Sequence, residues 1–120
     1  MINLKAINFN VNNKTRAYLD KRLKSLKKFV DLKSPNSTLD VEVGKTTEHH
    51  QKGEIFRTEL NLEIGGEFFR AVEKSEDILS SIDIAIEELI TQLRRRKDKK
   101  ETLYKKGGRK FKEMIRRFRS

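Results

Sequence analysis

The stretch FRTELNLEIGGEFFRAVE, residues 56–73, decides the fold. Its first half alternates core-facing and polar side chains, which predicts a strand with one buried face. Gly65 and Gly66 supply the positive φ angles of a tight hairpin turn, so residues 67–73 should return as an antiparallel strand. The side chains expected to face the core are those of Phe56, Thr58, Leu60, Leu62 and Ile64.

Two more strands are predicted upstream of this hairpin, with a helix between them. Residues 2–9 alternate loosely, with Ile2, Leu4 and Ala6 on one face, and residues 39–43 alternate clearly. Asn12 or Asn13 is placed to cap a helix over residues 15–31. Its apolar stripe recurs at intervals of four, three and four through Leu19, Leu23, Leu26 and Val30.

A second helix is predicted downstream of the hairpin. Ser75 should cap it, with Glu76 and Asp77 in its first turn, where carboxylates favour the helix dipole. The buried stripe is expected to comprise Ile78, Ile82, Ala85, Ile86, Leu89 and Leu93.

The order of elements, β-α-β-β-β-α, predicts an α+β fold. A right-handed crossover makes the first two strands parallel, and two antiparallel hairpins follow. If both helices cover one face of the four-stranded sheet, they run parallel and their C-terminal ends lie side by side. At 120 residues the chain has room for one domain and one core.

Basic side chains are concentrated at one end of the sequence. Residues 94–120 hold 14 of the 28 Lys and Arg residues but only three acids, which gives +11. The net charge of the whole chain is +10, so the first 93 residues sum to −1. Cations near a helix C-terminus also complement its dipole, but that effect saturates within a turn. A polyanion, and nucleic acid above all, is the partner that this distribution favours.

The predicted topology brings a second basic cluster to the same edge of the molecule. The end of the first helix contributes Lys24, Lys27 and Lys28. The end of the second helix contributes Arg94, Arg95, Arg96, Lys97, Lys99 and Lys100.

Other functional classes find little support in the sequence. The chain has no Cys, no signal peptide and no apolar run of membrane-spanning length, so we expect a soluble cytoplasmic protein with no membrane partner. Glu48, His49 and His50 form one loop cluster, but no further Cys or His exists to complete a structural zinc site. With no phosphate-cradling loop and no activated nucleophile, we expect no enzyme activity, small-molecule substrate, cofactor or metal.

Two helical segments resemble those of the ribosome hibernation promoting factors, also called ribosome-associated inhibitors. YLDKRLKSLKKF, residues 18–29, is similar to the first helix of that family, with Arg22 and Lys28 at its basic positions. The segment EDILSSIDIAIEELITQLRRRKDK, residues 76–99, resembles the second helix. Its matching residues are Glu76, Asp77, Ile82, Asp83, Leu89, Gln92, Leu93, Arg95, Lys97 and Lys99. The resemblance covers residues 1–100, and the fold of that family resembles a double-stranded RNA-binding domain with an added first strand.

The resemblance implies a protein that binds the small ribosomal subunit of the assembled ribosome in the channel of messenger and transfer RNA. It would block translation there under stress. Leu79, Ser25, Glu88 and Thr91 depart from residues usual in the family, which shifts the expected RNA contact toward the end of the second helix. The expected ribosomal RNA-binding residues are Arg22, Lys24, Lys28, Arg94, Arg95, Arg96, Lys97, Lys99 and Lys100.

Residues 101–120 are predicted to be a basic flexible tail or linker after a ribosome-binding domain of residues 1–100. Phe111, Met114, Ile115 and Phe118 have helical spacing, so the tail should be disordered alone and able to form an amphipathic helix on RNA or a partner. It could end a short family member or begin the linker of a long one. Alternative functions are a binder of non-ribosomal structured RNA, an integral ribosomal protein, or a membrane or protein interaction module acting through the tail.

Overall fold

The computed structural model describes residues 1–46 and 53–119 of the chain. Its elements follow the predicted order, with one short 3-10 helix added after the first α-helix. They are β1 (Ile2–Ile7), α1 (Asn13–Leu23), the 3-10 helix η1 (Lys24–Lys28), β2 (Ser37–Lys45), β3 (Phe56–Ile64), β4 (Glu67–Ser75) and α2 (Ile78–Arg119).

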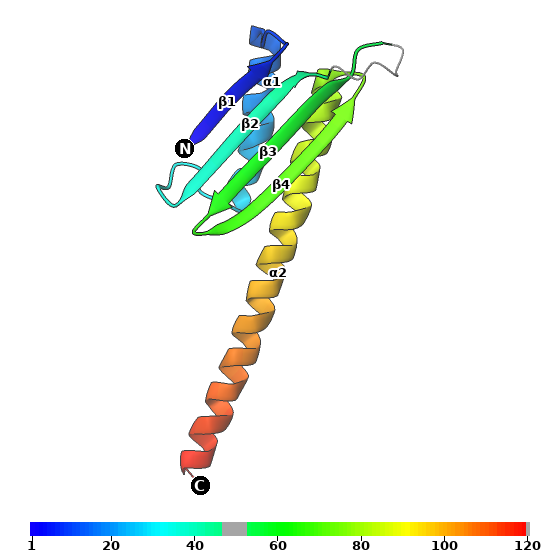
Figure 1. The fold of residues 1–120 in the computed structure, drawn as a ribbon. Coiled ribbons are helices and arrows are strands. Elements are labelled where there is room, and N and C mark those ends of the chain that lie inside the picture. Colours follow the sequence, from blue (N-terminus) through cyan, green and yellow to red (C-terminus); the bar gives the residue numbers. More distant parts are fainter. Residues whose placement is uncertain (47–52, 120) are drawn as a thin grey trace.

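The four strands form one sheet in the order β1-β2-β3-β4. β1 is parallel to β2, and the other neighbouring pairs are antiparallel. Both helices lie on the same face of the sheet and run in the same direction, with α1 behind β1 and β2 and α2 behind β3 and β4 (Figure 1). The predicted α+β fold with two parallel helices on one face is confirmed.

The β3–β4 hairpin has the predicted register and turn. Ile64 pairs with Glu67, and the intervening Gly65 and Gly66 have φ angles of 53° and 88°. These left-handed angles are strained for residues with a Cβ, so the glycines fix where the chain reverses. β4 runs to Ser75, two residues beyond the predicted end at residue 73.

One hydrophobic core fills the space between the sheet and the helices. The predicted stripes of both helices are buried in it, except that Ile78 is only partly buried. Ile90, which is 5% exposed, and Ser81 are also buried, although neither was predicted to be. The Ser81 hydroxyl lies 2.8 Å from the hydroxyl of Thr58 on β3, so the buried polar groups satisfy each other.

α1 begins as predicted but ends earlier. The Asn12 side chain accepts a hydrogen bond of 2.8 Å from the Thr15 amide and caps the helix. After Leu23 the chain tightens into η1, where the Ser25 hydroxyl donates to the Arg22 carbonyl at 2.5 Å. That carbonyl is the acceptor that the next α-helical turn would use, so the side chain competes with the backbone pattern. The single α-helix predicted over residues 15–31 is therefore wrong in its last turns.

The start of α2 differs from the prediction. Its first residue is Ile78, and the Asp77 carboxylate accepts bonds from the Ser80 amide at 3.3 Å and the Ser80 hydroxyl at 3.2 Å. Asp77 is thus the capping residue, and Ser75 belongs to β4. Ser75 and Asp77 are both favourable capping residues. The length of β4, which includes Ser75, determines that Asp77 is the one used.

α2 continues without interruption to Arg119, through Gly107 and Gly108. It extends well beyond the edge of the sheet (Figure 1). The division into a domain of residues 1–100 and a flexible tail of residues 101–120 stays a prediction. No helix in the described part of the chain is long and apolar enough to cross a bilayer.

Candidate RNA-binding surface

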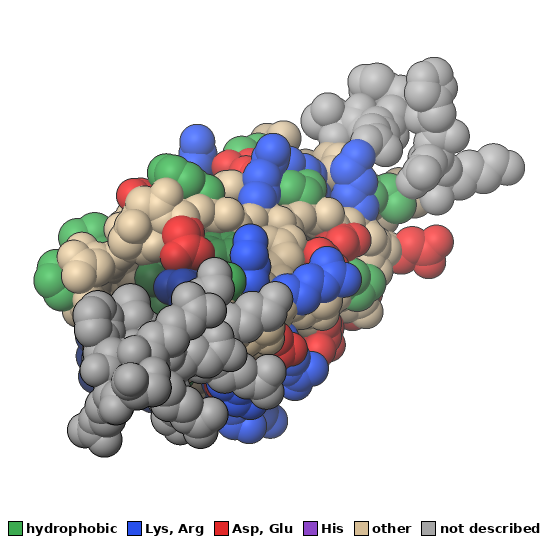
Figure 2. Space-filling model, turned by 90° about the horizontal axis from the view of Figure 1, so that it is seen from below, with side chains coloured by type: hydrophobic (Ala, Val, Ile, Leu, Met, Phe, Trp, Pro, Cys, Tyr) green, Lys and Arg blue, Asp and Glu red, His purple; other side chains and the backbone are tan. Residues whose placement is uncertain are grey.

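The ends of α1–η1 and of the sheet-packed part of α2 lie side by side, as predicted. The guanidinium of Arg94 on α2 lies 6.0 Å from the ring centre of Phe29, directly after η1. This cation–π contact joins the α2 cluster to the segment that directly follows the basic residues of η1. Figure 2, which views the molecule from this end, shows Lys and Arg side chains interspersed with Asp and Glu side chains.

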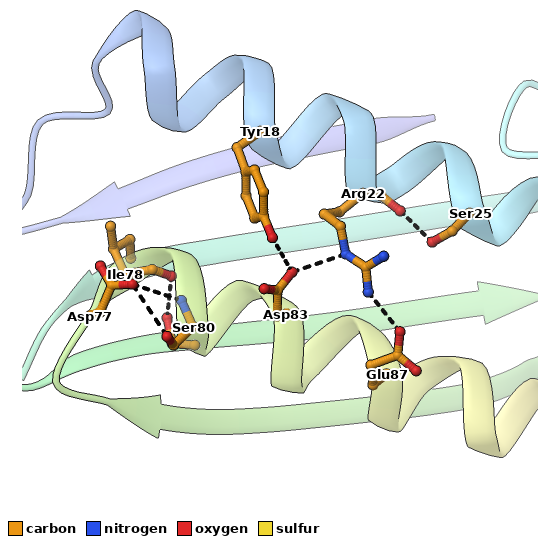
Figure 3. Close-up of polar contacts among 9 residues, drawn as sticks. Tyr18, Arg22, Ser25, Asp77, Ile78, Ser80, Asp83 and Glu87 are labelled. Atoms are coloured by element: carbon orange, nitrogen blue, oxygen red, sulfur yellow. Dashed lines mark hydrogen bonds and ion pairs between the residues drawn. The ribbon is translucent and has the colours of Figure 1, made fainter.

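Arg22 is engaged in a polar network between α1 and α2 (Figure 3). Its Nε lies 3.0 Å from Asp83 Oδ1, and its Nη2 donates to Glu87 Oε1 at 2.7 Å. The Tyr18 hydroxyl donates to the same Asp83 oxygen at 2.5 Å. With its side chain 25% exposed, Arg22 ties the helices together rather than presenting a free charge.

The network shifts the protonation equilibria of its members. The hydrogen bond to the Asp83 carboxylate raises the pKa of Tyr18, because the bond holds the phenol in its protonated form. The hydrogen bond to Glu87 raises the pKa of Arg22. Both shifts favour the states in which the bonds are intact.

A third acidic residue, Glu67, pairs with two of the predicted cations on α2. Glu67, at the start of β4, lies 2.9 Å from Arg96 Nε and 3.2 Å from Lys100 Nζ. The hydrogen bond from Arg96, followed by that from Lys100, lowers the pKa of Glu67. Arg96 and Lys100 are four residues apart and share one helix face, so a single carboxylate fastens α2 to the β3–β4 hairpin.

The other predicted residues remain exposed and form no ion pair with another residue of the described ranges 1–46 and 53–119. Arg95 and Lys99 are four residues apart and so share one exposed face of α2. These exposed cations are Lys24, Lys28, Arg94, Arg95, Lys97 and Lys99. Lys27 of η1 is exposed beside them. We call these six residues, from Lys24 to Lys99, the free basic cluster; Lys27 is not counted in it.

The acids that neutralise Arg22, Arg96 and Lys100 were not predicted from the sequence. Asp83 and Glu87 recur at helical spacing on α2, a signal that they share a face. Nothing in the sequence indicates that this face meets Arg22, because the contact depends on how α1 lies against α2. Glu67 follows the hairpin glycines, which could have placed it at the same edge as the end of α2.

Two arginines on the uncovered face of the sheet are already paired with acids. Arg57 lies 3.4 Å from Glu42 and 3.1 Å from Glu59, and Arg70 also contacts Glu59. The hydrogen bond from Arg70, and then that from Arg57, lowers the pKa of Glu59. Cross-strand pairing of this kind stabilises the sheet and leaves little charge for a polyanion. The free basic cluster on the helix side is the stronger RNA-binding candidate.

The described residues contain no group of three His, Cys, Asp or Glu side chains that could hold a metal ion. The loop cluster of Glu48, His49 and His50 lies outside those residues.

Known proteins share this sequence pattern and fold. The family described as sigma 54 modulation protein / S30EA ribosomal protein matches residues 2–101. The Protein Y N-terminal domain of Thermus thermophilus has a TM-score of 0.62 and 24% identity, covering 78% of this chain and 93% of that one. A ribosomal subunit interface protein from Coxiella burnetii has a TM-score of 0.64 and 16% identity, covering 81% and 97%. No curated protein matches the chain by sequence.

Proposed function

This chain belongs to the family described as sigma 54 modulation protein / S30EA ribosomal protein, and from that premise we propose that it is a ribosome hibernation factor. It binds the small subunit in the channel of messenger and transfer RNA and blocks translation sterically under stress. It acts in the cytoplasm, without catalysis or a cofactor. The structurally similar Coxiella burnetii protein is a ribosomal subunit interface protein, which supports a site between the subunits.

One observation carries the proposal: unpaired cations from η1 and from α2 meet at one end of a rigid domain. Lys28 and Arg94 belong to segments more than sixty residues apart in the sequence, yet Phe29 and Arg94 are in contact. The Glu67 contacts fix the direction of α2 where the cluster lies. The fold therefore arranges these charges in the free protein, before it binds a partner.

The mechanism is the replacement of counterions on ribosomal RNA phosphates. Each phosphate that the free basic cluster neutralises should contribute about −0.7 to −0.9 to the slope of log affinity against log salt. Phosphate contacts position a protein without reading the base sequence. Specificity would then come from the fit of the domain into a folded RNA cleft.

Co-sedimentation with separated small and large subunits across a salt series tests this function. Saturation at about one copy per small subunit, weakening steeply with salt, supports it. Equal binding to both subunits and to naked duplex RNA would favour the alternative, a general binder of structured RNA. Persistence on actively translating ribosomes would instead indicate an integral ribosomal protein.

Charge reversal tests the proposed surface. Arg95→Glu/Lys99→Glu should abolish small-subunit binding without changing the circular dichroism spectrum, because both side chains are exposed and make no ion pair with described residues. Lys5→Glu/Lys14→Glu carries the same change in net charge on exposed residues outside the cluster. This control should bind almost as the parent does. Equal losses in the two variants would show that only total charge matters and would contradict the assigned surface.

A further inference from the structure

A groove lies between α1–η1 and the start of β1, away from the α1–α2 network. Its volume is about 460 Å³, within the range of pockets that hold ligands. Most of its lining surface is apolar, although five of the nine lining residues are charged, and no aromatic residue contributes to it. The lining residues are Ile2, Asp20, Leu23, Lys24, Lys27, Val30, Asp31, Leu32 and Lys33.

The wall of this groove is fixed by backbone contacts. The Met1 ammonium donates to the Leu32 carbonyl at 2.8 Å and to the Ser37 carbonyl at 2.9 Å. These bonds hold the segment after η1 against the start of β1. The groove is thus part of the folded domain.

The groove borders the open edge of the sheet. β1 pairs with β2 on one side only, so its other edge presents backbone groups that no described strand satisfies. Ile2 and Ile7, which point to opposite faces of β1, are 45% and 36% exposed. The opposite edge differs, because Gln92 of α2 donates to the Arg70 carbonyl of β4 at 2.8 Å.

The charges around the groove are unbalanced. Its two acids are occupied within the chain: Asp20 lies 3.3 Å from Arg16, and the Asp31 carboxylate accepts the Lys33 amide at 3.0 Å. The lysines that line it form no ion pair with another described residue; they are Lys24, Lys27 and Lys33. The groove therefore combines an apolar lining with an uncompensated positive rim.

These features select among possible occupants. Single-stranded RNA gains most of its non-phosphate affinity by stacking bases on aromatic side chains, and the lining has none. A second copy paired through β1 would bring two sets of the same lysines together, in a chain of net charge +10. An acidic protein segment meets neither obstacle.

We propose that this groove and the edge of β1 form a docking site for an extended protein segment in which aliphatic and acidic residues alternate. The segment adds to the sheet as a strand beside β1, and its backbone satisfies the open edge. Alternate side chains point to opposite faces of a strand, so its aliphatic residues enter the groove. Its carboxylates meet the lysines at the rim.

Binding of synthetic peptides to the full chain tests the proposal. An array of peptides that alternate Val or Ile with Glu should bind, with shifts in the amide resonances of β1. Matched peptides with Lys in place of Glu should not bind, nor should peptides with a central Pro, which cannot complete the strand ladder. Failure of the whole acidic array overturns the proposal, as does stronger binding of single-stranded RNA to the same amides.

Two variants separate this site from the RNA surface. Lys33→Glu, which changes a groove lysine outside η1, should weaken peptide binding about twofold or more while small-subunit binding persists. Arg95→Glu/Lys99→Glu should leave peptide binding intact while subunit binding is lost. Loss of both activities in both variants overturns the proposal. Concentration-dependent dimerisation that protects the β1 amides also overturns it, by making this edge a self-interface.

Discussion

At the scale of single residues, the fold uses Arg22 differently from the expectation based on sequence. Asp83 and Glu87 of α2 surround its guanidinium, and Tyr18 shares the Asp83 carboxylate. The guanidinium of Arg22, which the resemblance assigned to RNA binding, instead forms ion pairs that link α1 to α2. A role of Arg22 in RNA binding stays a prediction, and it would require these contacts to open.

Tyr18→Phe should lower the free energy of unfolding by about 1 kcal/mol, because it removes one hydrogen bond to a partly exposed carboxylate. Urea denaturation measures the change. Tyr104→Phe is the matched control, since Tyr104 is 84% exposed. An unchanged midpoint for Tyr18→Phe would contradict the network drawn between the helices.

The same pair of tyrosines allows a pH test. In Tyr104→Phe, Tyr18 is the one tyrosine left of two, so tyrosinate absorbance reports it alone. The hydrogen bond to Asp83 raises the pKa of Tyr18 in the folded state, so the Tyr18 phenol should ionise at a higher pH than the usual value of about 10. The stabilisation is present below the unfolded pKa and is lost as the pH rises through the folded pKa.

Glu59 should govern part of the acid sensitivity. Its pKa is lowered mainly by Arg70, so its stabilisation is present above the unfolded value of about 4.3 and is lost as the pH falls through the folded pKa. In Glu59→Gln, the free energy of unfolding should fall less steeply as the pH is lowered through the acid range, which urea denaturation at a series of pH values measures. Glu63→Gln, at an exposed position on the same strand, is the matched control for the loss of one carboxylate.

At the scale of elements, apolar spacing predicted the helices and their buried faces, while side-chain hydrogen bonds set their ends. Leu19, Leu23 and Leu26 are buried although the chain changes from α1 to η1 among them. A 3-10 turn still places Leu26 toward the sheet. The stripe was therefore predictable, and the change caused by the Ser25 hydroxyl was not.

Leu89→Ala on α2 and Leu23→Ala on α1 should each destabilise the fold by about 2–5 kcal/mol, because both side chains are buried. Chemical denaturation measures the loss. Leu103→Ala, on the part of α2 beyond the sheet, is the control, since Leu103 is 58% exposed. Similar stabilities for all three variants would contradict the assigned helix faces.

At the scale of the whole molecule, charge is divided between a paired sheet face and an unpaired helix end. Arg57 and Arg70 are compensated by Glu42 and Glu59, whereas the free basic cluster has no such partner among the described residues. The electrostatic field therefore favours approach to a polyanion with the free basic cluster facing it.

Deleting residues 101–120 tests the division of the chain. The shortened protein should keep its melting cooperativity, because the buried residues of the core lie between Leu19 and Leu93. It should bind the small subunit more weakly and with a shallower salt slope, since cations are lost. Binding to acidic lipid vesicles, if the parent shows any, should vanish. Unfolding of the shortened chain would contradict a core confined to residues 1–100.

The sequence by itself determined the order of elements, the β3–β4 hairpin, the buried helix stripes and the concentration of cations. These follow from local spacing, since two glycines fix a turn and a period fixes a face. Only the tertiary structure decided which cations are free. Arg22, Arg96 and Lys100 meet acids from other elements, while Arg95 and Lys99 do not. Ion pairing depends on distances between segments far apart in the chain, and those distances exist only once the helices pack on the sheet.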